Sequence, residues 1–397
     1  MGDLDGDGAD DVAWQLPGGG VVAWAMRPAG SGAGHGGDAA GDSFDSVEDL
    51  RGSRFDDVLR GDAGANRLEG GRGDDWFLAT AGADMMDGGD GLDTADYSEA
   101  ATSVTVDLGA NSGGGAAAGH TWASVERVVG SAHADVLAGS GGAEVLEGGR
   151  GTDFLAGGGG ADTYVLNRGD GADAVSDGAA DANALALGPD VSWNQVTAGV
   201  HVGTDAIGNA KLDLELGILG TGDSLRVDYN FQQGGNVAKV LRLSDGSALD
   251  VGEVSFVWAG SDTGADAGNG EAGQADMLLG YGGNDTLRGM APGTVGTKGD
   301  IFVGGGGDDT LVAGVGDDTY AFDREGGRDT VHDSGGEDTI VLGPTLAAED
   351  VIFEIRDGDL YVGARDLLDP AKKASQVADF VRVSGGGTKW VDYYTGA

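Results

Sequence analysis

Apolar residues recur every nine positions along three stretches of the chain, and glycine and aspartate fill the intervals. In "GGGGDDTLVAGVGDDTY", which runs from Gly304 to Tyr320, Leu311 and Tyr320 each follow an aspartate by two positions. Neighbouring side chains of a strand point to opposite faces, so a strand of three residues directs one side chain inward. Glycine turns tightly because it adopts positive φ without strain. The pattern therefore predicts short strands joined by glycine turns.

Fourteen units of this kind lie in register. They begin at residues 52, 61, 70, 79 and 88, at 130, 139, 148 and 157, and at 271, 280, 304 and 313, with one interrupted unit that ends in 299–303. The sixth position is Asp, Asn or Glu in every unit, and the eighth is a large apolar residue in all units except the one with Ala95. Two units make one coil of 18 residues, and such coils stack as a solenoid. We expect an all-β chain of parallel β-roll blocks with β-rich capping segments.

The segments around the repeats predict the domain organisation. "SVEDLRGSRFDDVL" begins at Ser46 and "SVERVVGSAHADVL" at Ser124, and each leads into a roll. The open end of a solenoid needs a cover, so we interpret the strand-rich segments after the second and third rolls as caps. The expected segments are a calcium loop with strands (1–27), a Gly/Ala linker (28–45), β-roll block 1 (46–97), a strand-containing spacer (98–129), β-roll block 2 (130–165), a β-rich cap (166–258), β-roll block 3 (259–321) and a C-terminal β-rich cap (322–397).

The net charge limits the kinds of molecule or ion that the chain can bind. The chain has 67 acidic and 23 basic residues, and its formal net charge is −44. Nucleic acids and anionic membranes bind basic patches, so this composition excludes them and favours a cation. Cysteine is absent and the five histidines are scattered, which disfavours zinc. No apolar run is long enough to cross a bilayer.

The pattern G-G-x-G-x-D-x-U-x, with U an apolar residue, resembles the glycine-rich repeats of the repeats-in-toxin (RTX) family, the hemolysin-type calcium-binding repeats. The resemblance implies that calcium ions lie between successive turns, bound by sixth-position side chains. Coils one step apart bring together Asp57 with Asp75, Asp75 with Asp93, Asp135 with Asp153, Asp300 with Asp318, Asn66 with Asp84, and Glu144 with Asp162. The expected calcium ligands of the rolls are Asp57, Asp75, Asp84, Asp93, Asp135, Asp153, Asp162, Asp276, Asp285, Asp300, Asp309 and Asp318.

Two repeats depart from the family's Asp at the sixth position, and two neighbouring acids are left out of the ligand list. Asn66 and Glu144 stand where the family has Asp, which predicts weaker sites there. Asp308 and Asp317 occupy the variable fifth position, and we do not expect them to be primary ligands.

Electrostatics independently favours bound calcium. Sixth positions on one edge of a roll would lie one strand spacing apart, roughly 4.8 Å. Two unit charges about 4 Å apart repel by about 4 kcal/mol at an effective dielectric of 20, so a bare column opposes folding. Calcium takes six to eight hard oxygens, whereas magnesium prefers a smaller octahedral shell and keeps its waters. We therefore expect several calcium ions as the cofactor.

The N-terminal stretch "DLDGDGADDVAWQLPGGGVVAWAM", residues 3–26, resembles one FG-GAP-type blade repeat of a β-propeller. Asp3, Asp5, Asp7 and Asp11 occupy positions 1, 3, 5 and 9 of a calcium loop. Several blades are needed to close a propeller, so we expect the chain to be part of a larger protein.

The RTX resemblance implies a calcium-binding module of a secreted, extracellular bacterial protein that folds on calcium outside the cell after type I export. The chain has neither the H-E-x-x-H motif of zinc proteases nor the G-x-S-x-G elbow of lipases, and we expect no catalytic residues. Two alternatives stay open. The chain is a calcium-dependent adhesive, S-layer or polysaccharide-binding module, with polysaccharide or a cell surface as partner, or it is the non-catalytic C-terminal part of a larger secreted enzyme.

Overall fold

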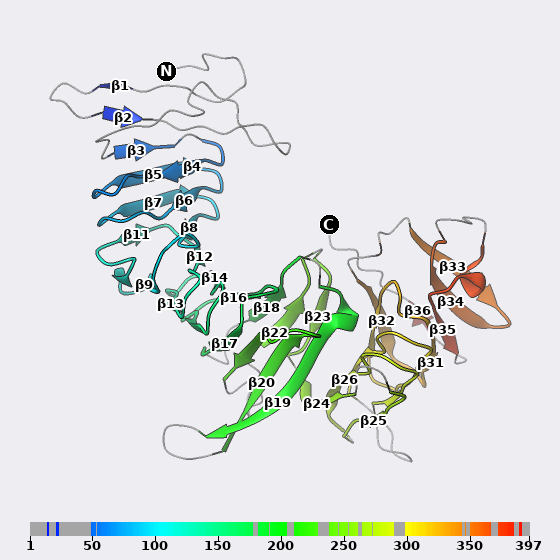
Figure 1. Cartoon of the computed structure of the whole chain (residues 1–397). Helices are drawn as coiled ribbons and strands as arrows, with labels where there is room; N and C mark the ends of the chain where they lie inside the picture. The colour runs from blue at the N-terminus through cyan, green and yellow to red at the C-terminus, as the bar shows by residue number, and fades with distance from the viewer. Residues whose placement is uncertain are drawn as a thin grey trace. The chain divides into compact units, whose positions relative to one another are not determined.

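The computed structural model divides the chain into two compact units, Met1–Asp181 and Ala182–Ala397 (Figure 1). The structure describes residues 14–15, 21–23, 49–52, 54–177, 182–189, 191–204, 210–228, 238–244, 246–252, 254–260, 264–271, 273–289, 298–343, 346, 350–366, 372–384 and 389–390. Among these residues strands dominate, and short 3-10 turns lie at Trp193–Gln195 (η1) and Ala374–Gln376 (η3). The chain is therefore all-β, as the sequence predicts.

The first unit is built from three series of hydrogen-bonded strands. One runs in the order β1 (Trp14–Gln15), β2 (Val21–Ala23), β3 (Asp49–Arg51), β5 (Arg67–Arg72), β7 (Met85–Asp90) and β11 (Thr121–Ala123). The second runs β4 (Val58–Arg60), β6 (Trp76–Leu78), β8 (Thr94–Asp96), β12 (Arg127–Val129), β14 (Val145–Glu147) and β16 (Thr163–Leu166). The third runs β10 (Ser112–Gly115), β9 (Val104–Asp107), β13 (Val136–Ala138), β15 (Phe154–Ala156) and β17 (Ala172–Val175).

Parallel pairing with a repeat of 18 residues produces the roll. Leu68 pairs with Met86, and Leu137 pairs with Leu155, so equivalent positions of successive coils lie side by side. The antiparallel exceptions in this unit are the hairpins β1–β2 and β9–β10. In Figure 1 the strands of the first unit follow one another as rungs, blue to cyan.

One series of strands is continuous across the spacer of the sequence prediction. Strand β12 pairs in parallel with β8 on one side and with β14 on the other. The chain between β8 and β12 forms the β9–β10 hairpin and then returns through β11, which pairs with β7. Both glycine-rich blocks of the first unit therefore belong to one stack.

The core of each roll is the column of eighth-position side chains. Leu59, Phe77, Leu146 and Leu278 are fully buried, whereas the flanking Val58 is 39% exposed. This alternation is what a three-residue strand requires, and each inward side chain contributes about 1.5–3 kcal/mol of hydrophobic burial.

Stacking requires glycine at Gly307, the fourth position of its unit. Gly307 has φ +137°, in the left-handed region. A Cβ on Gly307 would collide with the carbonyl oxygen of Gly283 in the preceding coil. The turns of neighbouring coils therefore approach backbone to backbone, which only glycine allows.

The second unit contains another roll. One of its sheets has the order β24 (Val254–Ala259), β26 (Ala275–Leu279), β28 (Ile301–Val303), β30 (Thr319–Phe322), β32 (Glu337–Leu342) and β36 (Lys389–Trp390). The facing sheet has the order β25 (Ala267–Asn269), β27 (Thr286–Arg288), β29 (Thr310–Val312), β31 (Arg328–His332), β35 (Phe380–Ser384), β34 (Asp359–Ala364) and β33 (Val351–Arg356). Two antiparallel groups complete the unit, β21 (Ser224–Val227) with β20 (Ala210–Ile218) and β19 (Val196–Thr204), and β23 (Ala248–Asp250) with β22 (Ala238–Arg242), which pairs with β18 (Asn183–Leu187).

The C-terminal strands close the core of this second roll. Phe302 and Tyr320 stack with their ring centroids 5.4 Å apart. Val381 of β35 and Val362 of β34 belong to the same buried cluster. The strand-rich segment after the repeats therefore extends the sheet of the roll and covers its apolar interior.

Candidate calcium sites

The sixth-position side chains form columns along the edges of the rolls. We name them column A (Asp57, Asp75, Asp93, Glu126, Glu144, Asp162), column B (Asn66, Asp84, His120), column C (Asp135, Asp153, Asp173), column D (Asp276, Asp300, Asp318, Asp338) and column E (Asp266, Asp285, Asp309, Asp329). Each of the twelve aspartates predicted from the repeats is at most 2% exposed. Such burial is rare for aspartate unless the carboxylate is paired or binds a metal.

One oxygen of most of these carboxylates accepts a regular hydrogen bond from the preceding coil. The backbone N–H of Asp57 donates to Asp75 Oδ1 at 2.8 Å, and the N–H of Asp300 donates to Asp318 Oδ1 at 2.7 Å. The same bond from one coil to the next recurs at Asp75–Asp93, Asn66–Asp84, Asp135–Asp153, Glu144–Asp162, Asp276–Asp300 and Asp285–Asp309. The pairs predicted from the register are thus neighbours in the structure.

The second oxygen of most of these carboxylates is buried without a hydrogen-bond donor. Atoms of this kind are Oδ2 of Asp75, Asp93, Asp153, Asp285, Asp300, Asp309, Asp318 and Asp338, Oδ1 of Asp276 and Oε2 of Glu144. Burying an ionised carboxylate without compensation is strongly unfavourable. Within the described residues, the roll edges therefore present repeated oxygen atoms that a cation would satisfy.

Backbone oxygens converge on the same places. A Cβ built on Gly280 would collide with both Asp285 Oδ2 and the carbonyl oxygen of Gly304 in the next coil. The absence of a side chain at this first position leaves a cradle lined by carboxylate and carbonyl oxygens. Calcium prefers this donor set, so the residues present fit the ion.

Burial raises the pKa of these carboxyl groups above the ordinary value of 3.8. The pKa rises to about 7 for Asp75 and Asp300 and to about 8 for Asp318. Burial is the largest cause, neighbouring carboxylates add to it, and the N–H bond from the preceding coil opposes it. At neutral pH the calcium-free columns therefore disfavour full ionisation.

Fifth-position acids make a separate, exposed ladder that runs the other way. Asp74 Oδ1 accepts the N–H of Leu92 in the following coil, and Asp317 Oδ1 accepts the N–H of Glu337. Asp308 Oδ1 likewise accepts the N–H of Arg328 at 3.1 Å. These acids accept hydrogen bonds from backbone donors of the turns.

The end of column D gathers a third carboxylate. Asp318, Asp333 and Asp338 each place an oxygen within 4.8 Å of the others. The Tyr320 hydroxyl donates to Asp333 Oδ2 at 2.7 Å, and the N–H of Gly335 donates to Asp333 Oδ1 at 2.7 Å. The roll core thus holds Asp333 beside the last two acids of the column.

Several column members escaped the sequence prediction. They are Glu126, Asp173, Asp266, Asp329 and Asp338, together with Asp333 beside column D. A partial signal existed for Asp266, which follows Gly264 and Ala265 as in a repeat, and for Asp329 and Asp338, which each follow glycine by two positions. Asp3, Asp5, Asp7 and Asp11 lie outside the described residues.

Comparison with known families supports the same interpretation. The family model described as RTX calcium-binding nonapeptide repeat (4 copies) matches residues 44–77, 60–95, 129–164, 138–175, 272–291, 295–324 and 325–344. No curated protein matches the chain. Among solved structures, the extracellular lipase LipA from Serratia marcescens matches with 22% identity and a TM-score of 0.29, over 66% of this chain and 38% of the lipase chain.

The matched ranges contain every member of columns C and D, and all members of columns A, B and E except Glu126, His120 and Asp266. Repeats of this type bind several calcium ions, and the buried oxygens of the columns supply the donors. The chain therefore carries RTX calcium-binding nonapeptide repeats in both compact units.

Proposed function

We propose that this chain is the calcium-binding module of a secreted bacterial protein and that it folds when it meets extracellular calcium. The observation that carries the proposal is the regular series of buried carboxylate oxygens without a donor along the roll edges. The net charge of −44 makes the calcium-free state self-repelling. Bound calcium would satisfy the oxygens and cancel the repulsion together.

The proposed ligands follow from the columns. In column A they are Asp57, Asp75, Asp93 and Asp162; in column C, Asp135 and Asp153; in column D, Asp276, Asp300 and Asp318; and in column E, Asp285 and Asp309. Asp3, Asp5, Asp7 and Asp11 stay proposed ligands of a separate N-terminal loop on the basis of their spacing alone.

Calcium concentration would act as the switch. A site with a dissociation constant of about 10 μM adds roughly 2.7 kcal/mol of stability at about 1 mM calcium and almost nothing at sub-micromolar calcium. Several such sites summed over a roll separate a largely unfolded chain inside the cell from a folded one outside. This difference suits export of an unfolded chain through a type I system.

We further propose that the chain itself is not catalytic. Its distinctive buried groups repeat from coil to coil, whereas a catalytic centre needs one unique constellation. In the described part of the chain, no helix has the length and apolarity to cross a bilayer. An adhesive or polysaccharide-binding role would keep the same calcium sites, and a carbohydrate array probed with and without calcium distinguishes it from a folding module.

A matched pair of substitutions tests the ligand assignment. Asp309→Asn removes the charge of a buried sixth-position carboxylate whose Oδ2 has no donor. We expect it to raise the calcium midpoint of folding of the second unit at least tenfold, because the loss of one ligand charge weakens binding by more than about 1.4 kcal/mol. Circular dichroism during calcium titration measures the midpoint.

The control is Asp308→Asn, at the neighbouring, exposed fifth position. It leaves a side-chain oxygen to accept the N–H of Arg328, so the calcium midpoint should change by less than about twofold. Equal shifts for the two variants would show that the sixth-position carboxylate has no special role.

A second test concerns the carboxylate cluster at the end of column D. Asp333→Asn leaves an acceptor for Tyr320 but removes one of three charges around the proposed last site. We expect about a tenfold weaker calcium affinity for this one site. Isothermal titration calorimetry should show one site displaced from the others, and an unchanged titration would remove Asp333 from the ligand set.

A further inference from the structure

Column B differs from every other column at its third position. The parallel pairing of β11 with β7 aligns Thr121 with Met85, which places His120 level with Asp84. His120 comes from the segment between the two glycine-rich blocks of the first unit, where the nonapeptide pattern is absent. A histidine therefore stands in the sixth position of a coil, where the other columns continue with an acid.

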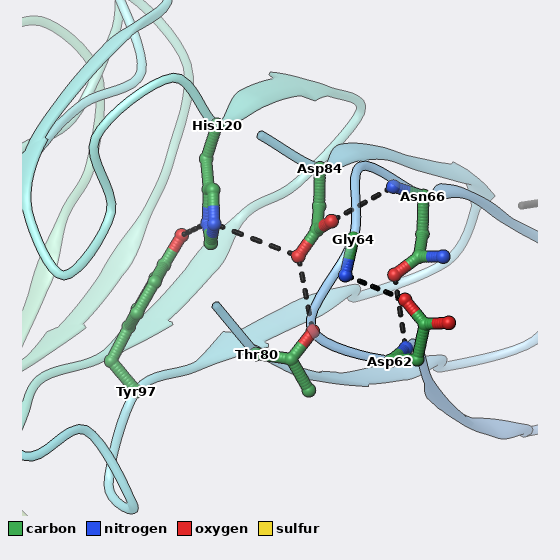
Figure 2. A network of polar contacts seen from close by, with 7 residues as sticks. All are labelled: Asp62, Gly64, Asn66, Thr80, Asp84, Tyr97 and His120. Carbon is green, nitrogen blue, oxygen red and sulfur yellow. Dashed lines mark hydrogen bonds and ion pairs between the residues drawn. The ribbon is translucent and has the colours of Figure 1, made fainter. Parts of the chain in front are cut away.

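The imidazole is locked against the acid of the preceding coil (Figure 2). His120 is 1% exposed, and its Nε2 lies 3.6 Å from Asp84 Oδ2. Its other nitrogen, Nδ1, is 3.0 Å from the Tyr97 hydroxyl. Tyr97 is itself 1% exposed, so both partners of the imidazole are fixed inside the roll.

Protein donors also occupy the oxygens of Asp84. The Thr80 hydroxyl donates to Oδ2 at 3.2 Å, and the N–H of Asn66 donates to Oδ1 at 2.9 Å. The side-chain oxygen of Asn66 in turn accepts the N–H of Asp62 at 3.0 Å. Figure 2 thus shows both oxygens of Asp84 with protein donors, where the other edges present carboxylate oxygens without donors.

The contrast with column A is direct, because both columns belong to the same coils. Asp75 lies one unit before Asp84, has the same complete burial and leaves its Oδ2 without a donor. Within the described residues, column B holds a single carboxylate, whereas column A continues from one acid to the next.

Column C shows that the Thr80 hydroxyl alone does not distinguish column B. Ser131 donates to Asp135 much as Thr80 donates to Asp84, so a hydroxyl in the turn is not unusual. The next coil in column C, however, supplies Asp153, whose Oδ2 has no donor. In column B the next coil supplies an imidazole instead.

We propose that His120 replaces calcium in column B, so that Asp84 is held by protein groups alone and this edge binds no ion. The inference rests on the proposed calcium function of the other columns. Calcium requires six to eight oxygen donors, and here one carboxylate faces an imidazole nitrogen, a hydroxyl and the backbone N–H of Asn66. The sequence expectation that Asp84 is a calcium ligand is replaced by a structural role within a calcium-independent step of the roll.

The test counts bound calcium in matched variants of the full chain. Asp75→Asn and Asp84→Asn make the same nearly isosteric change at two fully buried positions nine residues apart. After gel filtration in calcium-containing buffer, elemental analysis of the chain should give one ion fewer for Asp75→Asn and no change for Asp84→Asn. Loss of an ion in both variants would overturn the inference, and loss in neither would instead overturn the proposed calcium function.

The reciprocal variant restores the family pattern. His120→Asp places a second carboxylate beside Asp84, and we expect the chain to gain one bound calcium. His133→Asp is the matched control, because His133 is exposed at a fourth position of the same unit and should add none. If His120→Asp binds no more calcium than His133→Asp, the role assigned to His120 is wrong. This arm does not depend on whether Asp84→Asn folds.

Discussion

Removing calcium is expected to abolish the β-roll structure of both units. The calcium-free columns bring consecutive carboxylates to adjacent coils, as in Asp57–Asp75–Asp93 and Asp276–Asp300–Asp318. Circular dichroism of the whole chain should show a loss of most β signal in excess EGTA and its return in millimolar calcium. The same β content in both conditions would contradict the proposed folding switch.

The size of the effect follows from the small core of each coil. A coil buries only two large apolar side chains, such as Leu311 and Tyr320. Repulsion between adjacent carboxylates costs a few kcal/mol, on the order of what these side chains contribute. Each calcium ion reverses that repulsion and adds its own binding free energy, so the whole stack should respond cooperatively.

A magnesium control makes this prediction specific. Magnesium is smaller and keeps several waters, so it fits the wide cradle of carboxylate and carbonyl oxygens less well. Millimolar magnesium should therefore restore little of the β signal in the absence of calcium. Full recovery in magnesium would show that charge screening alone folds the chain.

The sequence predicts the core and the acid columns well because both depend on a local period. The burial of Leu59, Leu146 and Phe302 follows from alternation within a three-residue strand. The neighbours Asp300 and Asp318 follow from the coil length of 18 residues. Local geometry repeated in register leaves little freedom in these positions.

The period fails where a coil changes its length. Asp153 pairs with Asp173, and Asp318 with Asp338, across 20 residues instead of 18, so a nine-residue pattern ends before these acids. An interruption lengthens the step from Asp276 to Asp300 to 24 residues without breaking the column. The N–H···Oδ1 bond between neighbouring coils keeps its geometry although the loop between the two acids changes its length. A search for a fixed nine-residue period therefore misses these pairs.

The remaining column members reach their places through contacts between segments that are far apart in the sequence. Glu126 accepts the N–H of Asp93 across 33 residues, because the chain between them forms the β9–β10 hairpin and strand β11 before it returns to column A. His120 reaches Asp84 for the same reason. Nothing in the local sequence of either residue shows the coil on which it will stack.

Acidification should have opposite effects on the calcium-free and the calcium-bound chain. Without calcium, the folded roll has raised pKa values, about 7 for Asp153 and about 8 for Asp318, against 3.8 for the ordinary group. Between about pH 4 and pH 8 the folded state therefore binds more protons than the unfolded state, so its free energy of unfolding rises as pH falls. With calcium, protons compete for the same carboxylates, and acid should weaken the folded state.

Two measurements are made at about pH 5 and pH 8. Circular dichroism gives the folded fraction in buffers freed of calcium on a chelating resin, and denaturant unfolding gives the stability in the same buffers with calcium. Asp318→Asn tests one column member separately from the protonation of all other carboxylates that accompanies acidification. It removes a buried group that resists ionisation, so at pH 8 it should stabilise the calcium-free second unit and destabilise the calcium-bound one. Asp317→Asn, at the exposed fifth position, should do neither. A variant Asp318→Asn that changed stability in the same direction in both buffers would indicate that Asp318 contributes to packing and not to ion binding.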